Sequence, residues 1–141
     1  MATESPNIHD GSQTVAAANY GNTQSLAGPS GSGQYLGVIL SQSTDRTSVL
    51  VSAAGAQGYG ILQNKPNLGQ VCDVVIFGIT KAVVAAAAST RGKPQMFTAT
   101  GAVTDWVAGS AYSQIGYALE SGSSGQIITM FYGATPPKVL T

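Results

Sequence analysis

The sequence predicts an all-β fold: a small β-barrel or sandwich-like domain that carries an extended N-terminal arm. From residue 35 onward, segments rich in Val and Ile recur about every 8–12 residues, and glycine-rich turns separate them. Residues 1–33, by contrast, consist mainly of Ser, Asn, Thr, Gln, Gly and Ala. With 141 residues the chain has room for one domain, which at this length buries roughly 68–70% of its unfolded surface.

The first 33 residues predict an arm and not a part of the core. They hold few large apolar side chains, which are Ile8, Val15, Tyr20 and Leu26. Burial of so few groups cannot offset the entropy lost on ordering the segment. Glycine-rich residues 28–33 predict a hinge to a β-rich domain over 34–133, and Pro136 and Pro137 predict an extended tail over 134–141.

An arm of this kind can bind a partner through its main chain. Strand addition at an exposed sheet edge uses backbone hydrogen bonds and needs no particular side chains. We expect the candidate partner contacts to be Thr14, Val15, Ala16, Ala17, Ala18, Tyr20 and Leu26.

The strands expected in the domain follow from β-branched runs and the turns that bound them. Residues 35–40, 47–53 and 58–62 come first, followed by a turn at Pro66. The longest strand is expected over 70–79, where apolar residues occupy both alternating sets and predict a strand covered on both faces. The remaining expected strands cover 94–100, 102–107, 113–120 and 125–132.

Residues 81–89 are ambiguous between a helix and a strand. The four consecutive alanines at 85–88 favour a helix, and Gly92 could cap its end. Val83 and Val84 continue the strand chemistry, and nine residues would form a marginal helix. We therefore favour a strand.

Charge argues against nucleic acid as a partner and for association with protein. Lys plus Arg and Asp plus Glu number six each, so no basic stripe is available for phosphates. Charged residues make up 9% of the chain, against about 25% in ordinary soluble domains. A net charge near zero promotes association.

We expect no membrane segment, because the aliphatic run 82–88 is far shorter than the ~20 residues that span a bilayer. The first ten residues lack a secretion signal, so synthesis in a cytoplasm is expected.

The residues capable of catalysis or metal binding are few, and the sequence predicts no enzyme, no metal and no cofactor. His9 and Cys72 are each the single residue of their type and cannot build a zinc site. The carboxylates of the domain are Asp45, Asp73, Asp105 and Glu120. Most of them lie at expected turns or strand ends, where carboxylates are usually exposed to solvent and take no part in catalysis. Asp73 lies within an apolar run, and if buried it would need a partner such as Lys81 or a backbone N–H.

Three segments carry a family resemblance: GILQNKPNLGQVCDVVIFGITKAVVAAA, RGKPQMFTATGAVTDW and IGYALESGSSGQIITMFY. In order and spacing they resemble the capsid decoration (head cement) proteins of tailed bacteriophages, over about residues 58–132. The resemblance implies a small β-barrel-like domain, a homotrimer, that binds the outer surface of a capsid where major capsid protein subunits meet. It implies a virion location and no active site.

Two other functions stay open. A host- or glycan-binding head fibre or adhesin module would present exposed aromatic side chains to a sugar, and Trp106, Tyr112 and Tyr132 are the candidates. Coplanar exposed rings would favour that function, and burial of the rings would favour cement. A small hydrolase would need a cleft that holds two of the domain's carboxylates.

Overall fold

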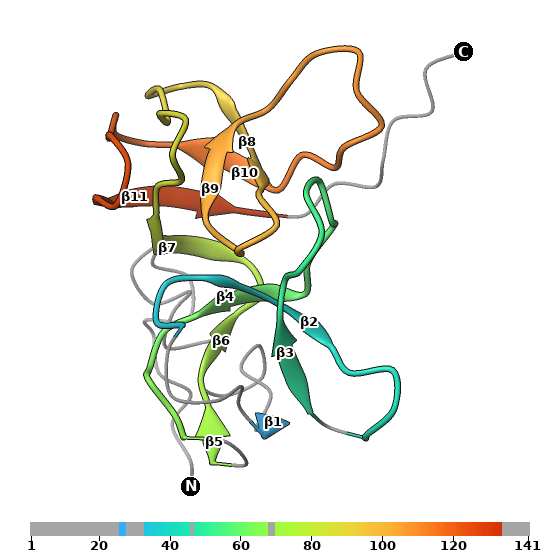
Figure 1. Ribbon diagram of the computed structural model, residues 1–141. Coiled ribbons are helices and arrows are strands. Elements are labelled where there is room, and N and C mark those ends of the chain that lie inside the picture. Colours follow the sequence, from blue (N-terminus) through green and yellow to red (C-terminus); the bar gives the residue numbers. More distant parts are fainter. Residues whose placement is uncertain (1–25, 28–32, 46, 68–69, 134–141) are drawn as a thin grey trace, which may run out of the picture.

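The computed structural model describes residues 26–27, 33–45, 47–67 and 70–133, and within these ranges it contains eleven β-strands and no helix (Figure 1). The all-β prediction is confirmed. The strands are β1 (Leu26–Ala27), β2 (Gly37–Leu40), β3 (Ser48–Leu50), β4 (Gly60–Leu62), β5 (Val71–Cys72), β6 (Val74–Val75), β7 (Gly78–Val83), β8 (Pro94–Phe97), β9 (Val103–Asp105), β10 (Gly116–Ala118) and β11 (Ile127–Tyr132).

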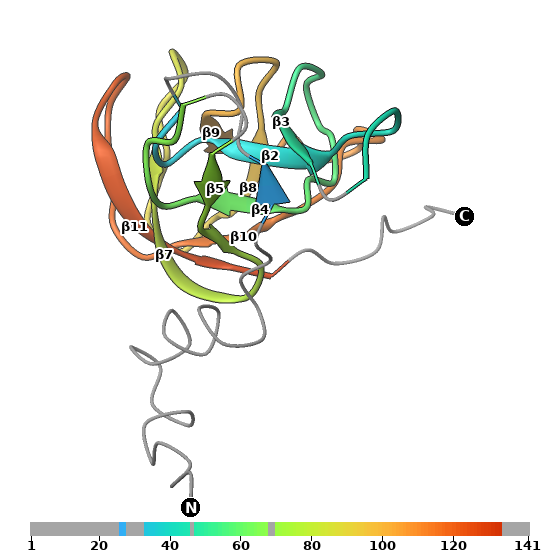
Figure 2. The ribbon, with the colours of Figure 1, turned by 90° about the horizontal axis from the view of Figure 1, so that it is seen from below.

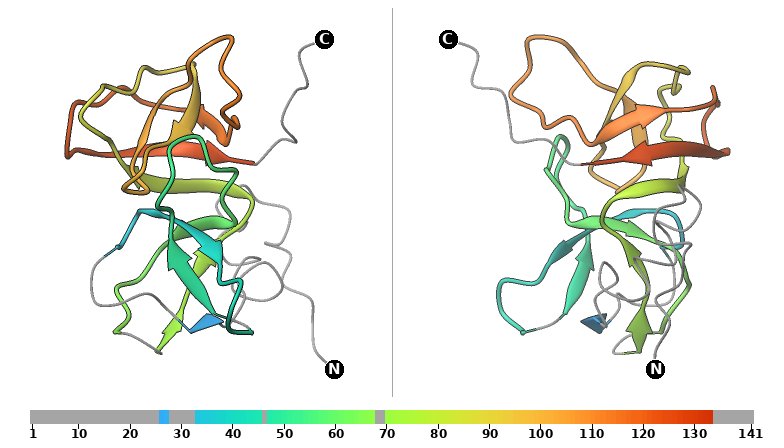
Figure 3. Two further views of the ribbon diagram at one scale, coloured as in Figure 1. Left: turned by 45° about the vertical axis from the view of Figure 1, so that its right-hand side comes forward. Right: turned by 180° about the vertical axis from the view of Figure 1, so that it is seen from behind.

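The strands form antiparallel sheets that stack in a sandwich-like arrangement. A five-stranded sheet has the order β7-β11-β10-β8-β9, a four-stranded sheet has the order β3-β2-β4-β6, and β1 pairs with β5. One parallel bridge from Val84 to Val103 connects the segment after β7 to β9, but no strand ladder closes either larger sheet into a barrel. Both views of Figure 3 show the two larger sheets one above the other, with β7 at their boundary.

The main core lies between the two larger sheets, and side chains from both contribute to it. The inward side chains of β11 are Ile128, Met130 and Tyr132, and they pack with Ile61 of β4. The ring of Phe97 on β8 lies 6.2 Å from that of Tyr132, centroid to centroid. Full burial of an aromatic or aliphatic side chain of this size stabilises the fold by about 1.5–3 kcal/mol. The sheets are therefore held together by a shared apolar layer.

A second, smaller apolar cluster lies under the four-stranded sheet. It contains Val38, Leu62, Cys72 and Val74, all fully buried. Cys72 is a buried free thiol that packs in this cluster, and its Sγ shares a hydrogen bond with the Ser48 hydroxyl (3.3 Å).

The expectation of one long strand over 70–79 is wrong. The chain forms β5, β6 and the start of β7 instead, because Asn64 interrupts the ladder. The Asn64 side chain accepts a hydrogen bond from the N–H of Asp73 (3.0 Å) and donates one to the carbonyl of Val71 (3.2 Å). The run is also not covered on both faces, since Val71 is 62% exposed and Phe77 is 55% exposed.

Residues 81–89 form a strand only as far as Val83, where β7 ends, and residues 85–88 are irregular. Alanine propensity is overridden there by long-range main-chain pairing. The N–H of Val84 donates to Gln126, and the N–H of Ala85 donates to Val103, both at 2.8 Å. These bonds use the donors that a helix would require.

Candidate partner-binding face of the five-stranded sheet

Three neighbouring strands of the five-stranded sheet place apolar side chains on the side that points away from the core. Figure 2 shows β7 and β11 running side by side, and β10 pairs with the other edge of β11. The register sets Ile79 opposite Phe131, and Phe131 opposite Tyr117. Residues directly opposite one another project from the same side of a sheet. An apolar row therefore crosses three strands.

Further along the strands the same side remains largely apolar. Val83 pairs with Ile127, and Lys81 pairs with Thr129 between the two apolar rows. Phe77 extends the first row, because its ring packs edge-on against Phe131 with a centroid separation of 5.2 Å. We call this surface the outer face, and it consists of Phe77, Ile79, Lys81, Val83, Pro94, Tyr117, Leu119, Ile127, Thr129 and Phe131.

Several apolar side chains of the outer face are exposed to solvent, at positions where an isolated domain would carry polar side chains. Tyr117 and Ile127 are 50% and 52% exposed, and Ile79 and Leu119 are 40% and 44% exposed. Antiparallel sheets with one side in water usually alternate apolar inward and polar outward residues. A contiguous exposed apolar patch marks a site of interaction. The arrangement is suited to binding a protein surface.

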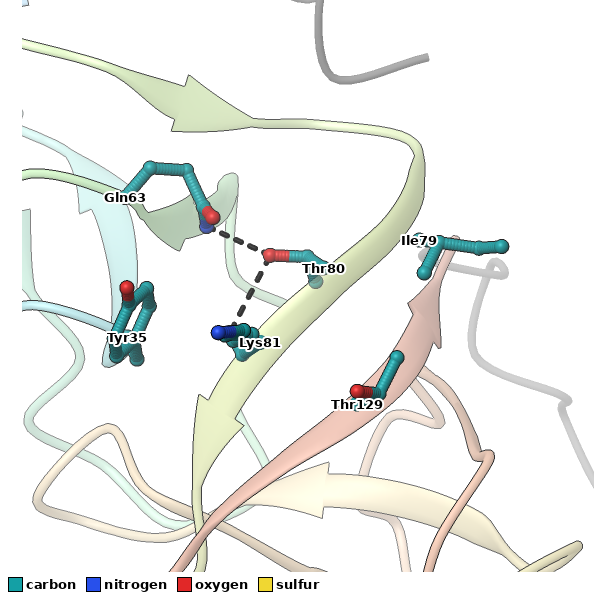
Figure 4. A pocket seen from close by; sticks show the side chains of 6 residues that line it. All are labelled: Tyr35, Gln63, Ile79, Thr80, Lys81 and Thr129. Carbon is teal, nitrogen blue, oxygen red and sulfur yellow. Dashed lines mark hydrogen bonds between the residues drawn. The ribbon is translucent and has the colours of Figure 1, made fainter. Parts of the chain in front are cut away.

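A shallow pocket of about 310 Å³ adjoins Lys81 at the border of the outer face (Figure 4). Its lining residues are Tyr35, Gln63, Ile79, Thr80, Lys81 and Thr129. The Gln63 amide donates to the hydroxyl of Thr80 (2.7 Å) and so holds one wall in place. Among the described residues, the Lys81 ammonium makes no ion pair and the Thr129 hydroxyl makes no hydrogen bond. Within the described part of the chain, the pocket is thus lined by an ammonium without an ion pair and by a hydroxyl without a hydrogen bond.

The backbone of Tyr35, on another wall of the pocket, is strained. Its φ of 66° lies in the left-handed region, which a bulky residue rarely adopts. Two hydrogen bonds hold it there: the Tyr35 N–H donates to Leu62 (2.7 Å), and the N–H of Val83 donates to the Tyr35 carbonyl (3.0 Å). Such strain costs on the order of 1–3 kcal/mol and persists only where the surroundings enforce it.

Asp105 is built into the fold. Its carboxylate accepts hydrogen bonds from the main chain and hydroxyl of Thr90 (both 2.7 Å) and from the Gln95 amide (2.9 Å), and Lys93 lies 3.6 Å away. Burial by itself would raise the pKa of Asp105, but these hydrogen bonds and the Lys93 charge outweigh it and lower the pKa. Its four donor contacts give Asp105 a structural role that was not expected from the sequence.

The other carboxylates do not gather into a catalytic arrangement. Asp45 and Asp73 are exposed, so Asp73 does not need the buried partner considered from the sequence. Glu120 accepts a hydrogen bond from the main-chain N–H of Thr129. Within the described part of the chain, no three His, Cys, Asp or Glu side chains lie close enough together to hold a metal ion. The same part contains no helix of the length and apolarity needed to cross a membrane.

The aromatic residues proposed as a sugar-binding patch do not form one. Tyr132 is fully buried in the main core, because β11 directs it inward. The Trp106 indole N–H donates to the carbonyl of Tyr112 (2.8 Å), and Tyr112 is 41% exposed. The exposed aromatic rings of the outer face are instead Phe77 and Tyr117.

Most of the predicted partner contacts lie outside the described residues, namely Thr14, Val15, Ala16, Ala17, Ala18 and Tyr20. His9 lies outside them as well. Leu26 is described, and its main chain pairs with Cys72 of β5 in the same molecule.

The outer face is not among the sites expected from the sequence, although the sequence contains a signal for it. In residues 127–132 both alternating sets are apolar or aromatic, apart from Thr129. That pattern indicates a strand with a second apolar side, a property expected from the sequence for residues 70–79 instead.

Comparison with known proteins gives a likeness of fold. No protein-family profile matches the sequence, and no curated protein matches it. The chain is similar in fold to a solved structure, the N base of the head fibre gp8.5 of bacteriophage phi29. The TM-score is 0.61 and the sequence identity is 16%. The match covers 76% of this chain and 89% of the phage chain. At this identity, the likeness shows a shared fold.

Proposed function

We propose that this chain is a structural protein of a bacteriophage head, which binds the outer surface of the capsid and stabilises contacts between major capsid subunits. The observation that carries the proposal is the fold shared with the phi29 head-fibre base over 76% of the chain. The resemblance of residues 58–132 to head cement proteins supports the same kind of particle. The comparison of folds thus favours a protein of a phage head, and the resemblance expected from the sequence is consistent with it.

The physical character of the molecule supports a binding role without catalysis. The outer face provides apolar surface that is suited to a protein partner. The carboxylate of Asp105 is engaged in holding the fold, and Glu120 accepts a main-chain hydrogen bond. We therefore propose that the protein is not an enzyme and uses no cofactor.

Assembly on the shell would follow the symmetry of the shell. We propose a homotrimer, since a three-fold arrangement suits the points at which capsid subunits meet. Residues 14–18 would add contacts to the shell by strand addition, which needs only main-chain groups.

A second candidate function is the base of a head fibre. The likeness to the phi29 structure favours it, because that protein is the base of such a fibre. Both candidates attach to the head, but they differ in the effect on the shell. Cement that bridges subunits stabilises the assembled shell by mass action, whereas a fibre base needs no such effect.

Two measurements test the proposal. Purified protein should co-sediment with empty shells of the phage that encodes it, and absence of binding would refute a head protein. Decorated shells should then disrupt at a higher temperature than bare shells. If the protein binds but decorated and bare shells melt together, cement is wrong and the fibre base is favoured.

A further inference from the structure

Lys81 is the one charged side chain among the ten residues of the outer face. It is exposed, and its neighbours on the two adjacent rows are Ile79, Val83 and the side chains opposite them on β11. Its ammonium pairs with no carboxylate of the described residues, whose one ion pair joins Lys93 and Asp105. The outer face is therefore an apolar surface with a single positive charge near its middle.

Any partner that covers this face removes the Lys81 ammonium from water. Removal of an ammonium from water is expensive unless it is paired and hydrogen-bonded. A partner that was wholly apolar would leave the Lys81 ammonium buried and unpaired. The pocket beside Lys81 supplies what a carboxylate needs: the ammonium, the Thr129 hydroxyl as a second donor, and walls formed by Tyr35 and Ile79. Charge complementarity thus specifies an acidic side chain.

The Lys81 charge also disfavours a second copy of this face as the occupant. Face-to-face pairing of two identical surfaces would bring a second Lys81 ammonium and no carboxylate from the face. Glu120, beside the face, already accepts the main-chain N–H of Thr129. Like charges brought together in an interface disfavour that pairing.

We propose that the outer face binds a different protein, at an apolar surface with one Asp or Glu side chain that enters the pocket and pairs with Lys81. The identification of that surface with the capsid rests on the proposed function above. In this complex the apolar rows supply the buried area, and the carboxylate fixes the register of docking. Lys81 acts as the specificity-determining residue, because a surface without a matching carboxylate is penalised.

The test compares shell binding of the full chain with that of Lys81→Met, Lys81→Glu and Lys81→Arg. Loss of one member of a buried ion pair costs enough to raise the apparent Kd at least about thirtyfold, so we expect this for Lys81→Met. Lys81→Glu should bind more weakly still, and Lys81→Arg should retain most of the affinity. The matched controls are Lys65→Met and Lys65→Glu, since Lys65 is also exposed and unpaired in the described structure but lies outside the outer face. We expect these controls to bind within about threefold of the original chain, as surface substitutions usually change energies by little.

Sedimentation velocity on each free protein completes the test. All variants should keep the oligomeric state and melting temperature of the original chain. If the original chain binds shells and the Lys81 variants bind equally well, the carboxylate contact is wrong and the head function stands. If Lys81→Glu changes the oligomeric state, the face is occupied by a second copy and the proposal is overturned. If the original chain does not bind shells, the proposed head function is wrong. The capsid is then also excluded as the partner that covers the outer face.

Discussion

Substitution of Gly116 by alanine is expected to be among the most damaging single changes in the sheet that carries the outer face. Gly116 lies on β10, where its main chain pairs with Tyr132 of β11 on one side and with Gln95 of β8 on the other. Its φ is +145°, and a Cβ there would fall 1.8 Å from the carbonyl oxygen of Phe131. That oxygen belongs to the backbone, so no side-chain rotation can relieve the clash.

The loss of stability follows from the changes that the added Cβ forces on the backbone of β10. The alanine must adopt a backbone conformation that costs about 1–3 kcal/mol, and its Cβ also forces β10 away from β11. Separation of the strands leaves buried main-chain groups unpaired, at about 1–3 kcal/mol each. We therefore expect Gly116→Ala to lower the free energy of unfolding by about 3–5 kcal/mol, a large part of the 5–15 kcal/mol typical of a domain.

The matched control is Gly125→Ala. Gly125 also has a positive φ, of +79°, but a Cβ there would meet nothing within 4 Å. It should therefore show only the conformational cost, about 1–2 kcal/mol. Thermal and urea unfolding followed by circular dichroism measure both variants. At about 4–8 °C per kcal/mol, Gly116→Ala should melt at least ~4 °C below Gly125→Ala. Equal melting temperatures would refute the close approach of β10 to β11.

Three further predictions follow from other parts of the molecule. Tyr132→Phe should leave stability unchanged or raise it by about 1 kcal/mol in thermal unfolding, because the Tyr132 hydroxyl is buried without a hydrogen-bond partner in the described structure; a loss of more than about 1 kcal/mol would indicate a partner. Asp105→Asn should destabilise the protein at pH 7, and the difference in stability should shrink as the pH falls below 3.8. Because the folded state lowers the pKa of Asp105, the charged carboxylate stabilises the fold at pH values above its ordinary pKa of 3.8. This stabilisation is lost as the pH falls through the lower pKa of the folded state. A difference in stability that does not change with pH would contradict the role of the carboxylate. Deletion of residues 1–25 should leave the melting temperature of the domain unchanged and weaken shell binding at least tenfold, about 1.4 kcal/mol, whereas unchanged affinity would exclude the arm from the contact.

Local sequence was sufficient for the fold class and for most strand positions. The expected segments 35–40, 58–62, 94–100 and 125–132 each contain an observed strand, β2, β4, β8 and β11. β-branched runs between glycine turns specify extended backbone through short-range sterics, which the sequence displays directly. The failure over 70–79 has a long-range cause, since the Asn64 side chain replaces a neighbouring strand beside Asp73.

The sequence by itself thus determined an all-β domain with low charge and few groups capable of catalysis. Only the tertiary structure decided which side of each strand meets the core. In residues 127–132 both alternating sets can be buried, and the register with β7 and β10 is what directs Tyr132 inward and Phe131 outward. The same long-range pairing aligns Lys81 with Thr129 and brings Tyr35 to the pocket. The candidate site was hidden in the sequence because its residues come from segments that only sheet formation places side by side.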